Sequence, residues 1–203
     1  HTSSTVKSIG GTGGVLSILI EKNDGTEICI EAEKSIVAIG IAANIDGLGL
    51  ENTKIQTIEG HIKVNHWMET SESHIYAIGD VVGPPWLAHK ASHEAVVCVE
   101  KIAGLPDIRQ LDYNQIPGCT YSRPQVASIG LTEQKATEAN KELKIGRFPF
   151  RGNGKAVALG EPEGLIKTIF DAVTGELLGA HMVGPEVTEL VHGFVIAMGL
   201  ECT

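Results

Sequence analysis

Several features are missing from the sequence, and each absence argues against a class of protein. No run of 18 apolar residues is present, so no segment is long enough to cross a bilayer as a helix. Cations are in the minority, with 16 Lys and Arg against 25 Asp and Glu. The resulting net charge of -9 argues against a nucleic-acid surface, which needs clustered cations. Residues 1–11 lack the apolar centre of a secretion signal.

Closely spaced cysteines are also missing. The four cysteines are Cys29, Cys98, Cys119 and Cys202. No two of them form a Cys-x-x-Cys pair, so the spacing indicates neither a local redox pair nor a metal site. Each lies in an apolar or strand-like context, which predicts reduced and mostly buried thiols in a reducing compartment.

The first part of the chain is predicted to contain hairpins and short strands. An Asp-Gly pair and a Glu-Gly pair supply turns for hairpins over residues 15–32 and 57–65. The apolar runs 35–40 and 75–78 are typical of strands that are buried on both faces.

One amphipathic helix is predicted over residues 88–103, ended by Gly104 and Pro106. Its apolar face comprises Ala91, Ala95, Val99 and Ile102. Its opposite side, which we expect to face water, comprises Lys90, Glu94 and Lys101.

The chain changes character at the polar, proline-containing stretch 105–118, which we interpret as a domain boundary. The elements predicted beyond it are a strand over 125–130, a helix capped by Thr132 and running to about residue 143, a hairpin over 164–184, and a helix opened by Pro185. Hairpins with segregated helices indicate an α+β arrangement.

Two motifs that could indicate ligand sites are interpreted otherwise. The glycines of residues 10–14 precede a strand, whereas a dinucleotide-binding loop follows a strand and opens a helix, so a flexible turn is predicted. His89 and His93 are one helical turn apart, but Lys90 stands where the metalloprotease motif has Glu. Since no third ligand is in view, no metal site is predicted.

Asp80 is the strongest candidate for a binding residue. It follows the predicted strand 75–78, and the carboxyl end of a strand is where α/β sheets bind ligands. An ionised carboxylate there can accept hydrogen bonds from sugar or polyol hydroxyls. A helix then begins near Leu87, Ala88 and His89, and its unpaired N–H groups favour a ligand that is, or becomes, negative. The alternative is a structural carboxylate that caps the next turn.

Four segments of the sequence resemble the pyridine nucleotide–disulfide oxidoreductases, in particular the members that oxidise dihydrolipoamide. IYAIGDVVGPPWLAHKASHEA resembles the second FAD-binding segment of the family, and SIVAIGIAANIDGLGLENTKI resembles the end of its NAD-binding domain. YSRPQVASIGLTEQKA and GELLGAHMVGPEVTELVHGFVIAMGLE resemble its dimerisation domain.

The resemblance implies an α/β and α+β fold in three parts. These are the C-terminal end of a NAD-binding domain over residues 1–44, a central FAD-contacting segment over 45–114, and an α+β dimerisation domain over 115–203. The dimerisation domain would have an antiparallel sheet with flanking helices and would be truncated at its C-terminus.

The resemblance also implies contacts to the cofactors FAD and NAD. Asp80 would bind the ribityl hydroxyls of FAD, Gly79 would let the backbone approach closely, and Gly40 would lie beside the nicotinamide. The residues whose backbone would face the flavin pyrimidine edge are Leu87, Ala88 and His89. The chain departs from the family after Gly40, where a GRxPN pattern is common, because it has no Arg there.

The activity implied is the oxidation of dihydrolipoamide and the reduction of NAD⁺ through FAD and a redox disulfide, serving 2-oxoacid dehydrogenase complexes. The redox cysteine pair and the His-Glu pair that this chemistry needs are not found between His1 and Thr203. We therefore expect the chain to be part of a longer enzyme and to be inactive in isolation. Alternatives are a disulfide reductase of the glutathione or mercuric reductase type, and a non-catalytic dimerisation or binding module.

The resemblance further implies two protein partners and a compartment. We expect a homodimer formed through the C-terminal domain and binding to the lipoyl-bearing core of a 2-oxoacid dehydrogenase complex. The expected location is the bacterial cytoplasm, with the mitochondrial matrix as the alternative.

Overall fold

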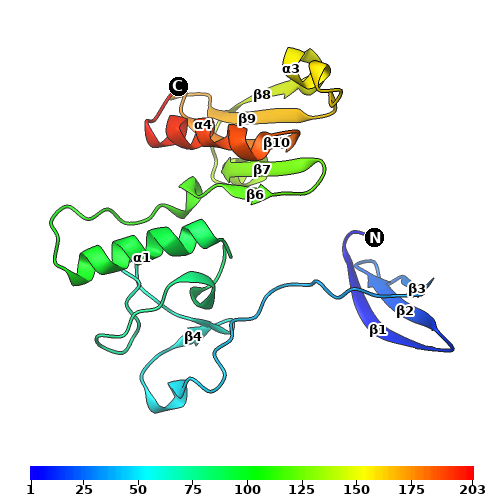
Figure 1. Ribbon diagram of the computed structural model, residues 1–203, viewed down its shortest axis with the longest axis horizontal. Helices are drawn as coiled ribbons and strands as arrows, with labels where there is room; N and C mark the ends of the chain where they lie inside the picture. The colour runs from blue at the N-terminus through cyan, green and yellow to red at the C-terminus, as the bar shows by residue number, and fades with distance from the viewer. The chain divides into compact units, whose positions relative to one another are not determined.

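The computed structural model describes all 203 residues, which form two compact units, residues 1–42 and residues 43–203 (Figure 1). The first unit is a three-stranded antiparallel sheet in the order β1-β2-β3. Its strands are β1 (Ser4–Thr12), β2 (Val15–Lys22) and β3 (Glu27–Ala32). The hairpin predicted over residues 15–32 is confirmed. The glycine-rich stretch 10–14 ends β1 and turns into β2, so it connects two strands.

The strand predicted over residues 35–40 is wrong. This segment has no regular structure, and Ile36 and Ile39 are 91% and 87% exposed. A strand buried on both faces needs a neighbouring strand and a covering layer, and no strand of this chain pairs with the segment.

The second unit begins with short elements that lead to one long helix. They are a 3-10 turn at Leu50–Asn52, β4 (Thr57–Ile58), β5 (His61–Ile62), a 3-10 turn at Gly79–Val82, and α1 (Ala88–Ile102). The β4-β5 hairpin and the helix confirm two predictions. The strand predicted over 75–78 is wrong, because only Tyr76 forms a bridge, to Glu69.

The faces of α1 were also predicted wrongly. Lys90 and Glu94, expected in water, are fully buried, whereas Val99 and Ile102 are 62% and 58% exposed. The helical period is correct, but the charged residues are buried because they bond to backbone groups of an earlier turn, as described below.

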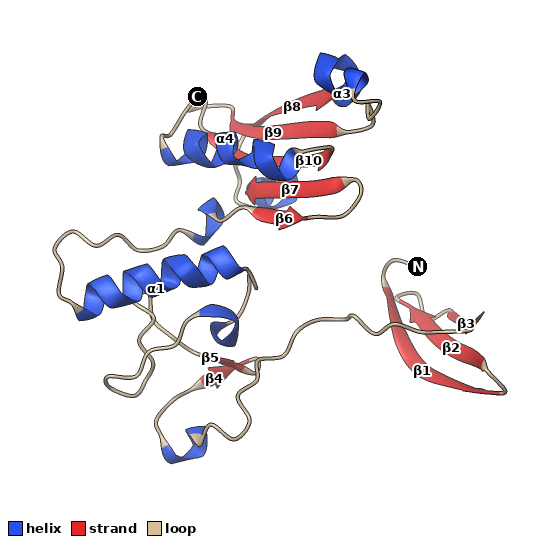
Figure 2. Cartoon of the chain, viewed as in Figure 1, coloured by secondary structure: helices blue, strands red, loops and turns tan.

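The rest of the second unit is an antiparallel sheet with helices (Figure 2), which confirms the predicted α+β pattern. The strands, in the spatial order β6-β7-β10-β9-β8, are β6 (Gly118–Thr120), β7 (Gln125–Gly130), β8 (Leu143–Pro149), β9 (Leu165–Asp171) and β10 (Leu177–Gly184). The helices are α2 (Glu133–Glu138), α3 (Gly154–Ala158) and α4 (Val187–Gly199), and 3-10 turns lie at Tyr113–Gln115 and Phe150–Gly152.

Most of the elements predicted here are confirmed, and two helix ends differ. Thr132 caps α2 by accepting a hydrogen bond from the Lys135 amide, but the helix ends at Glu138, because Asn140 has a left-handed φ of +56 that does not continue a helix. α4 begins at Val187 and not at Pro185, since Glu186 is its N-cap. The division between residues 114 and 115 stays a prediction.

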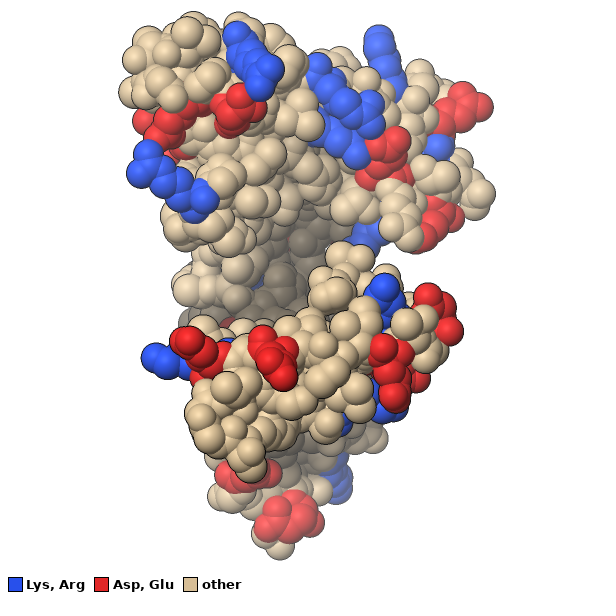
Figure 3. All heavy atoms as spheres, turned by 90° about the vertical axis from the view of Figure 1, so that its right-hand side faces the viewer, with Lys and Arg blue, Asp and Glu red and all other residues tan.

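Two apolar clusters hold this sheet to its helices. The larger joins α4 to the central strands through Ala127, Ile129, Ala180, Met182, Val187 and Val191. The smaller joins α2 to β9 and β10 through Ala136, Ile169 and Leu178. On the face drawn in Figure 3, acidic and basic side chains are interspersed. Exposed residues of the chain form several ion pairs, such as Lys155 with Glu186. Such exposed pairs contribute little to stability, so the apolar clusters carry the fold.

Candidate functional site

The 3-10 turn Gly79–Val82 carries the predicted binding residue Asp80. Gly79 is buried and has φ +79, a left-handed backbone conformation that favours glycine. Asp80, the next residue, is exposed, and its carboxylate has no hydrogen-bonding partner in the chain. Asp80 therefore lies at the start of a turn and not at the tip of a buried strand, and its carboxylate is free to accept a bond from a ligand hydroxyl.

The positive end of the helix dipole at the start of α1 has no acidic side chain or capping acceptor beside it. Its N-cap, Leu87, has extended backbone and offers no side-chain acceptor, and the first turn contains no acid. Ala88 is exposed and His89 is half-buried. The free N–H groups and the positive end of the helix dipole would favour negative charge placed against them. The His89 ring points elsewhere, because its Nε2 donates to the Pro117 carbonyl at 2.8 Å.

A buried network connects this helix to the Asp80 turn. Glu94 Oε2 accepts a hydrogen bond from the Gly79 amide at 2.7 Å. Lys90 Nζ donates to the carbonyl oxygens of Gly79 and Gly83, at 3.1 and 2.8 Å. The same ammonium lies 3.2 Å from Glu94 Oε1, so the two charges also form an ion pair.

Tyr113 completes the network from the segment that precedes β6. Its hydroxyl donates to Glu94 Oε1 at 2.8 Å. Tyr113 is 40% exposed, and its partial burial, followed by the negative Glu94 that accepts this hydrogen bond, raises its pKa. The phenol therefore stays protonated at neutral pH and remains a donor to Glu94.

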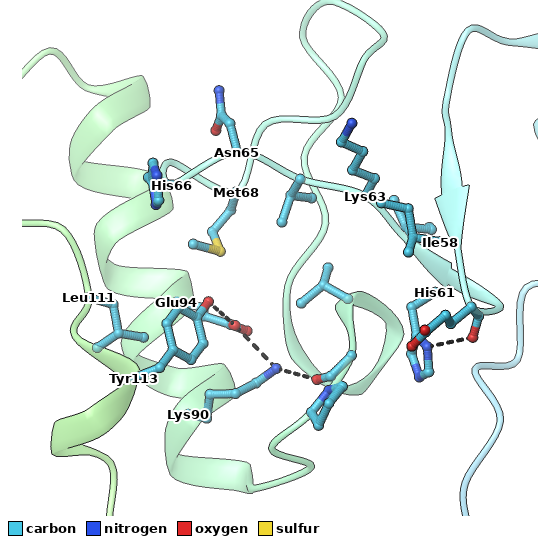
Figure 4. Close-up of a pocket in the computed structure, with 16 residues that line it drawn as sticks. Ile58, His61, Lys63, Asn65, His66, Met68, Lys90, Glu94, Leu111 and Tyr113 are labelled. Atoms are coloured by element: carbon cyan, nitrogen blue, oxygen red, sulfur yellow. Dashed lines mark hydrogen bonds and ion pairs between the residues drawn. The ribbon is translucent and has the colours of Figure 1, made fainter. Parts of the chain in front are cut away.

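A cavity of about 460 Å³ opens beside this network (Figure 4). Figure 4 shows Lys90 and Glu94 projecting from α1 toward its interior, with Tyr113 beside them. The lining also includes Met68 and His61. His61 donates through Nδ1 to the Glu59 carbonyl at 3.0 Å, while its Nε2 is buried without a partner.

The structure brings some of the predicted site residues close together and adds residues that were not predicted. Gly79, Asp80 and the α1 start lie in one compact unit, and backbone groups of the turn are bonded to α1. Gly40 belongs to the first unit, where it is exposed with φ +84. Lys90, Glu94 and Tyr113 were not predicted. The sequence signal for Lys90 and Glu94 is a Lys-x-x-x-Glu pair, which is far more common on solvated helix surfaces, and Tyr113 has no such signal.

The cysteines differ from the prediction in one respect. All four are free thiols, but only Cys98 is buried, Cys119 is half-buried, and Cys29 and Cys202 are exposed. Burial raises the pKa of the Cys98 and Cys119 thiols, which disfavours the reactive thiolate. No group of three or more His, Cys, Asp or Glu side chains is arranged to hold a metal. None of the helices has the length and apolar character needed to span a membrane.

Comparison with known proteins identifies the family. The model of the pyridine nucleotide–disulphide oxidoreductases matches residues 1–95, and the model of their dimerisation domain matches residues 116–203. Among curated proteins, the dihydrolipoyl dehydrogenase of Rhizobium etli is 54% identical over 202 residues, and that of Bacillus subtilis is 48% identical over 192. These matches cover 100% and 95% of the chain but 42% and 40% of the relatives, so the chain spans less than half of their length.

Solved structures share the fold. LpdA from Mycobacterium tuberculosis has a TM-score of 0.83 at 24% identity, over 98% of this chain and 43% of that one. The HOCl-induced flavoprotein disulfide reductase RclA from Escherichia coli has a TM-score of 0.81 at 18% identity, over 98% of this chain and 45% of that one. Because the two family models together match nearly all of the sequence, the chain belongs to the pyridine nucleotide–disulfide oxidoreductase family.

Proposed function

We propose that the protein containing this chain is a dihydrolipoyl dehydrogenase, a flavoprotein that oxidises dihydrolipoamide and reduces NAD⁺ through FAD and a redox disulfide. The observation that carries the proposal is the 54% identity to an enzyme of that name over essentially the whole chain. A match of this extent includes both the Asp80 segment and the dimerisation domain, and so is not due to one shared motif.

The residues around Asp80 fit a flavin. The free carboxylate of Asp80 would accept hydrogen bonds from ribityl hydroxyls of FAD. The backbone of Leu87, Ala88 and His89 would face the pyrimidine edge of the ring. Bound FAD would supply the electron relay between a dithiol and nicotinamide. The α1 start would stabilise the negative charge that the ring gains on reduction, since no acid in its first turn offsets the dipole.

Gly40 would contribute to the nicotinamide side of the site. It is exposed, and its lack of a side chain would let a cofactor ring approach the backbone closely.

The 203-residue chain by itself should not turn over dihydrolipoamide. Its four cysteines are widely spaced and none is bonded to another, and burial disfavours the thiolate of two of them. A dithiol substrate would therefore meet no reactive cysteine pair within these residues.

The proposed partners follow from the same family. Residues 116–203 match a dimerisation domain, which supports a homodimer formed through this part of the chain. A lipoyl-bearing core of a 2-oxoacid dehydrogenase complex would present the substrate. The named relatives are bacterial, which supports the bacterial cytoplasm as the location.

The test uses the natural protein that contains this sequence. The purified protein should carry FAD and reduce NAD⁺ with dihydrolipoamide. Asp80→Asn should weaken FAD binding about tenfold or more, because a hydrogen bond to a charged acceptor is replaced by a neutral one. Asp107→Asn is the matched control, since Asp107 lies in an exposed loop with φ +60, a conformation that Asn tolerates. A wild-type protein without flavin, or one that turns over glutathione disulfide instead, would contradict the proposal.

A further inference from the structure

Lys90 and Glu94 are charged residues that the proposed chemistry does not use, yet both are fully buried. Burying two charges carries a large desolvation cost, and a close ion pair recovers this cost only when further hydrogen bonds satisfy both groups. An apolar pair of similar size would often serve stability as well. Their presence therefore calls for a role that an apolar pair could not fill.

The hydrogen bonds of the pair indicate that role. The ammonium of Lys90 has three donors and three acceptors around it, namely the carbonyls of Gly79 and Gly83 and the carboxylate of Glu94. Glu94 binds the Gly79 amide with one oxygen and the Tyr113 hydroxyl with the other. The pair thus holds both backbone polar groups of Gly79 and the carbonyl that follows the turn.

These contacts join two separate parts of the proposed flavin site. One part is Asp80, which follows Gly79 directly in the chain and therefore moves with it. The other is the start of α1, and Lys90 and Glu94 lie in the first two turns of that same helix. Since both ends of the Gly79–Val82 turn are bonded to α1, the distance and orientation between Asp80 and the helix start are fixed by this pair.

We propose that Lys90 and Glu94 are positioning residues for the flavin, which set the placement of the Asp80 carboxylate relative to the α1 start. The inference rests on the proposed function, because it assumes that a flavin lies against both. Tyr113 supports the pair by holding Glu94 Oε1 from the other side.

The test uses three variants of the natural protein, each prepared as apoprotein and titrated with FAD. Glu94→Gln keeps the size of the side chain but removes its charge. Tyr113→Phe removes one donor and leaves the ion pair. Lys90→Met/Glu94→Leu replaces the buried charges with apolar groups and leaves neither charge unpaired. Glu133→Gln is the matched control, because Glu133 pairs with Lys167 and Arg147 at the surface, on α2.

We expect the FAD dissociation constant to rise about tenfold or more in Glu94→Gln and about two- to tenfold in Tyr113→Phe, with a shifted visible flavin band. The double variant should melt below the wild type and bind FAD weakly, because the polar backbone groups of Gly79 and Gly83 have lost their partners. Glu133→Gln should match the wild type in both readouts.

Two outcomes would overturn the inference. One is FAD binding within twofold of the wild type in Glu94→Gln and in the double variant. The other is an unchanged flavin band with weaker binding that tracks the unfolded fraction, as a purely structural pair would give. Failure of the proposed function is recognised separately, because the wild-type protein would then lack FAD or lipoamide activity.

Discussion

Replacing Gly79 with Ala should separate backbone strain from cofactor positioning. Gly79 has φ +79, and a left-handed conformation costs a residue with a Cβ about 1–2 kcal/mol. The added methyl group would lie 3.4 Å from the Ala91 Cβ, an ordinary contact, so strain is the main term. Gly60 is the matched control, because it has φ +77 in the β4-β5 turn of the same unit and open space around it.

The two variants should lose similar stability but differ in FAD binding. A loss of about 1–2 kcal/mol corresponds to a fall of about 2–8 °C in melting temperature for a unit of this size. Gly79→Ala can relieve its strain only by rotating the two peptide groups that flank residue 79, one of which donates its amide to Glu94 and the other of which accepts from Lys90. That rotation would move Asp80, so FAD binding should weaken several-fold.

Differential scanning fluorimetry of the apoproteins and titration with FAD supply the two measurements. Gly60→Ala should show the melting shift alone, with FAD affinity like that of the wild type. Equal FAD affinity in the two variants would refute the reasoning, because it would mean that the conformation of Gly79 does not control the placement of Asp80.

Three further predictions concern the fold. Ile169→Ala should destabilise the second unit by about 2–5 kcal/mol in urea unfolding, since Ile169 is fully buried between α2 and the sheet; a loss below 1 kcal/mol would mean that this cluster is not a packed core. Thr132→Ala should cost about 1 kcal/mol, because it removes the acceptor that caps α2, and Thr132→Ser should not. Because the folded state raises the pKa of Tyr113, the contribution of the protonated phenol to folding stability is present below pH 10 and is lost as pH rises above the ordinary tyrosine value. Stability of the wild type should therefore fall more steeply above pH 10 than that of Tyr113→Phe, and parallel curves would contradict this.

Elements whose hydrogen bonds are local could be predicted from the sequence. The hairpins over residues 15–32 and 164–184 depend on turn residues between alternating strands, and both are present. Thr132 caps its helix through a bond three residues away. These features need no knowledge of distant parts of the chain, so local turn and capping chemistry was sufficient to predict them.

The apolar runs over 35–40 and 75–78 show where this reasoning fails. A continuous apolar run is consistent with a buried strand but does not reveal whether neighbouring strands exist. Residues 35–40 have no pairing strand in the chain, and Tyr76 makes only one bridge. Hydrophobicity measures a preference for burial, whereas strand formation also needs a partner backbone at hydrogen-bonding distance.

The burial of Lys90 and Glu94 was predicted wrongly for a related reason. A helical wheel places Lys90 and Glu94 beside each other correctly, but it assigns charged residues to water because it considers only the solvent as their partner. In the structure their partners are the amide and the carbonyl of Gly79, which lies 11 residues before Lys90 and 15 residues before Glu94. Gly79 has a positive φ and lies in a 3-10 turn, so its polar groups are not used by regular secondary structure. A buried backbone group that lacks a regular partner requires a side-chain one, and a Lys-Glu pair one helical turn apart supplies both a donor and an acceptor. A turn that begins with glycine and precedes a helix bearing such a pair therefore predicts that the two charged residues are buried. The charges considered alone would predict that they are exposed.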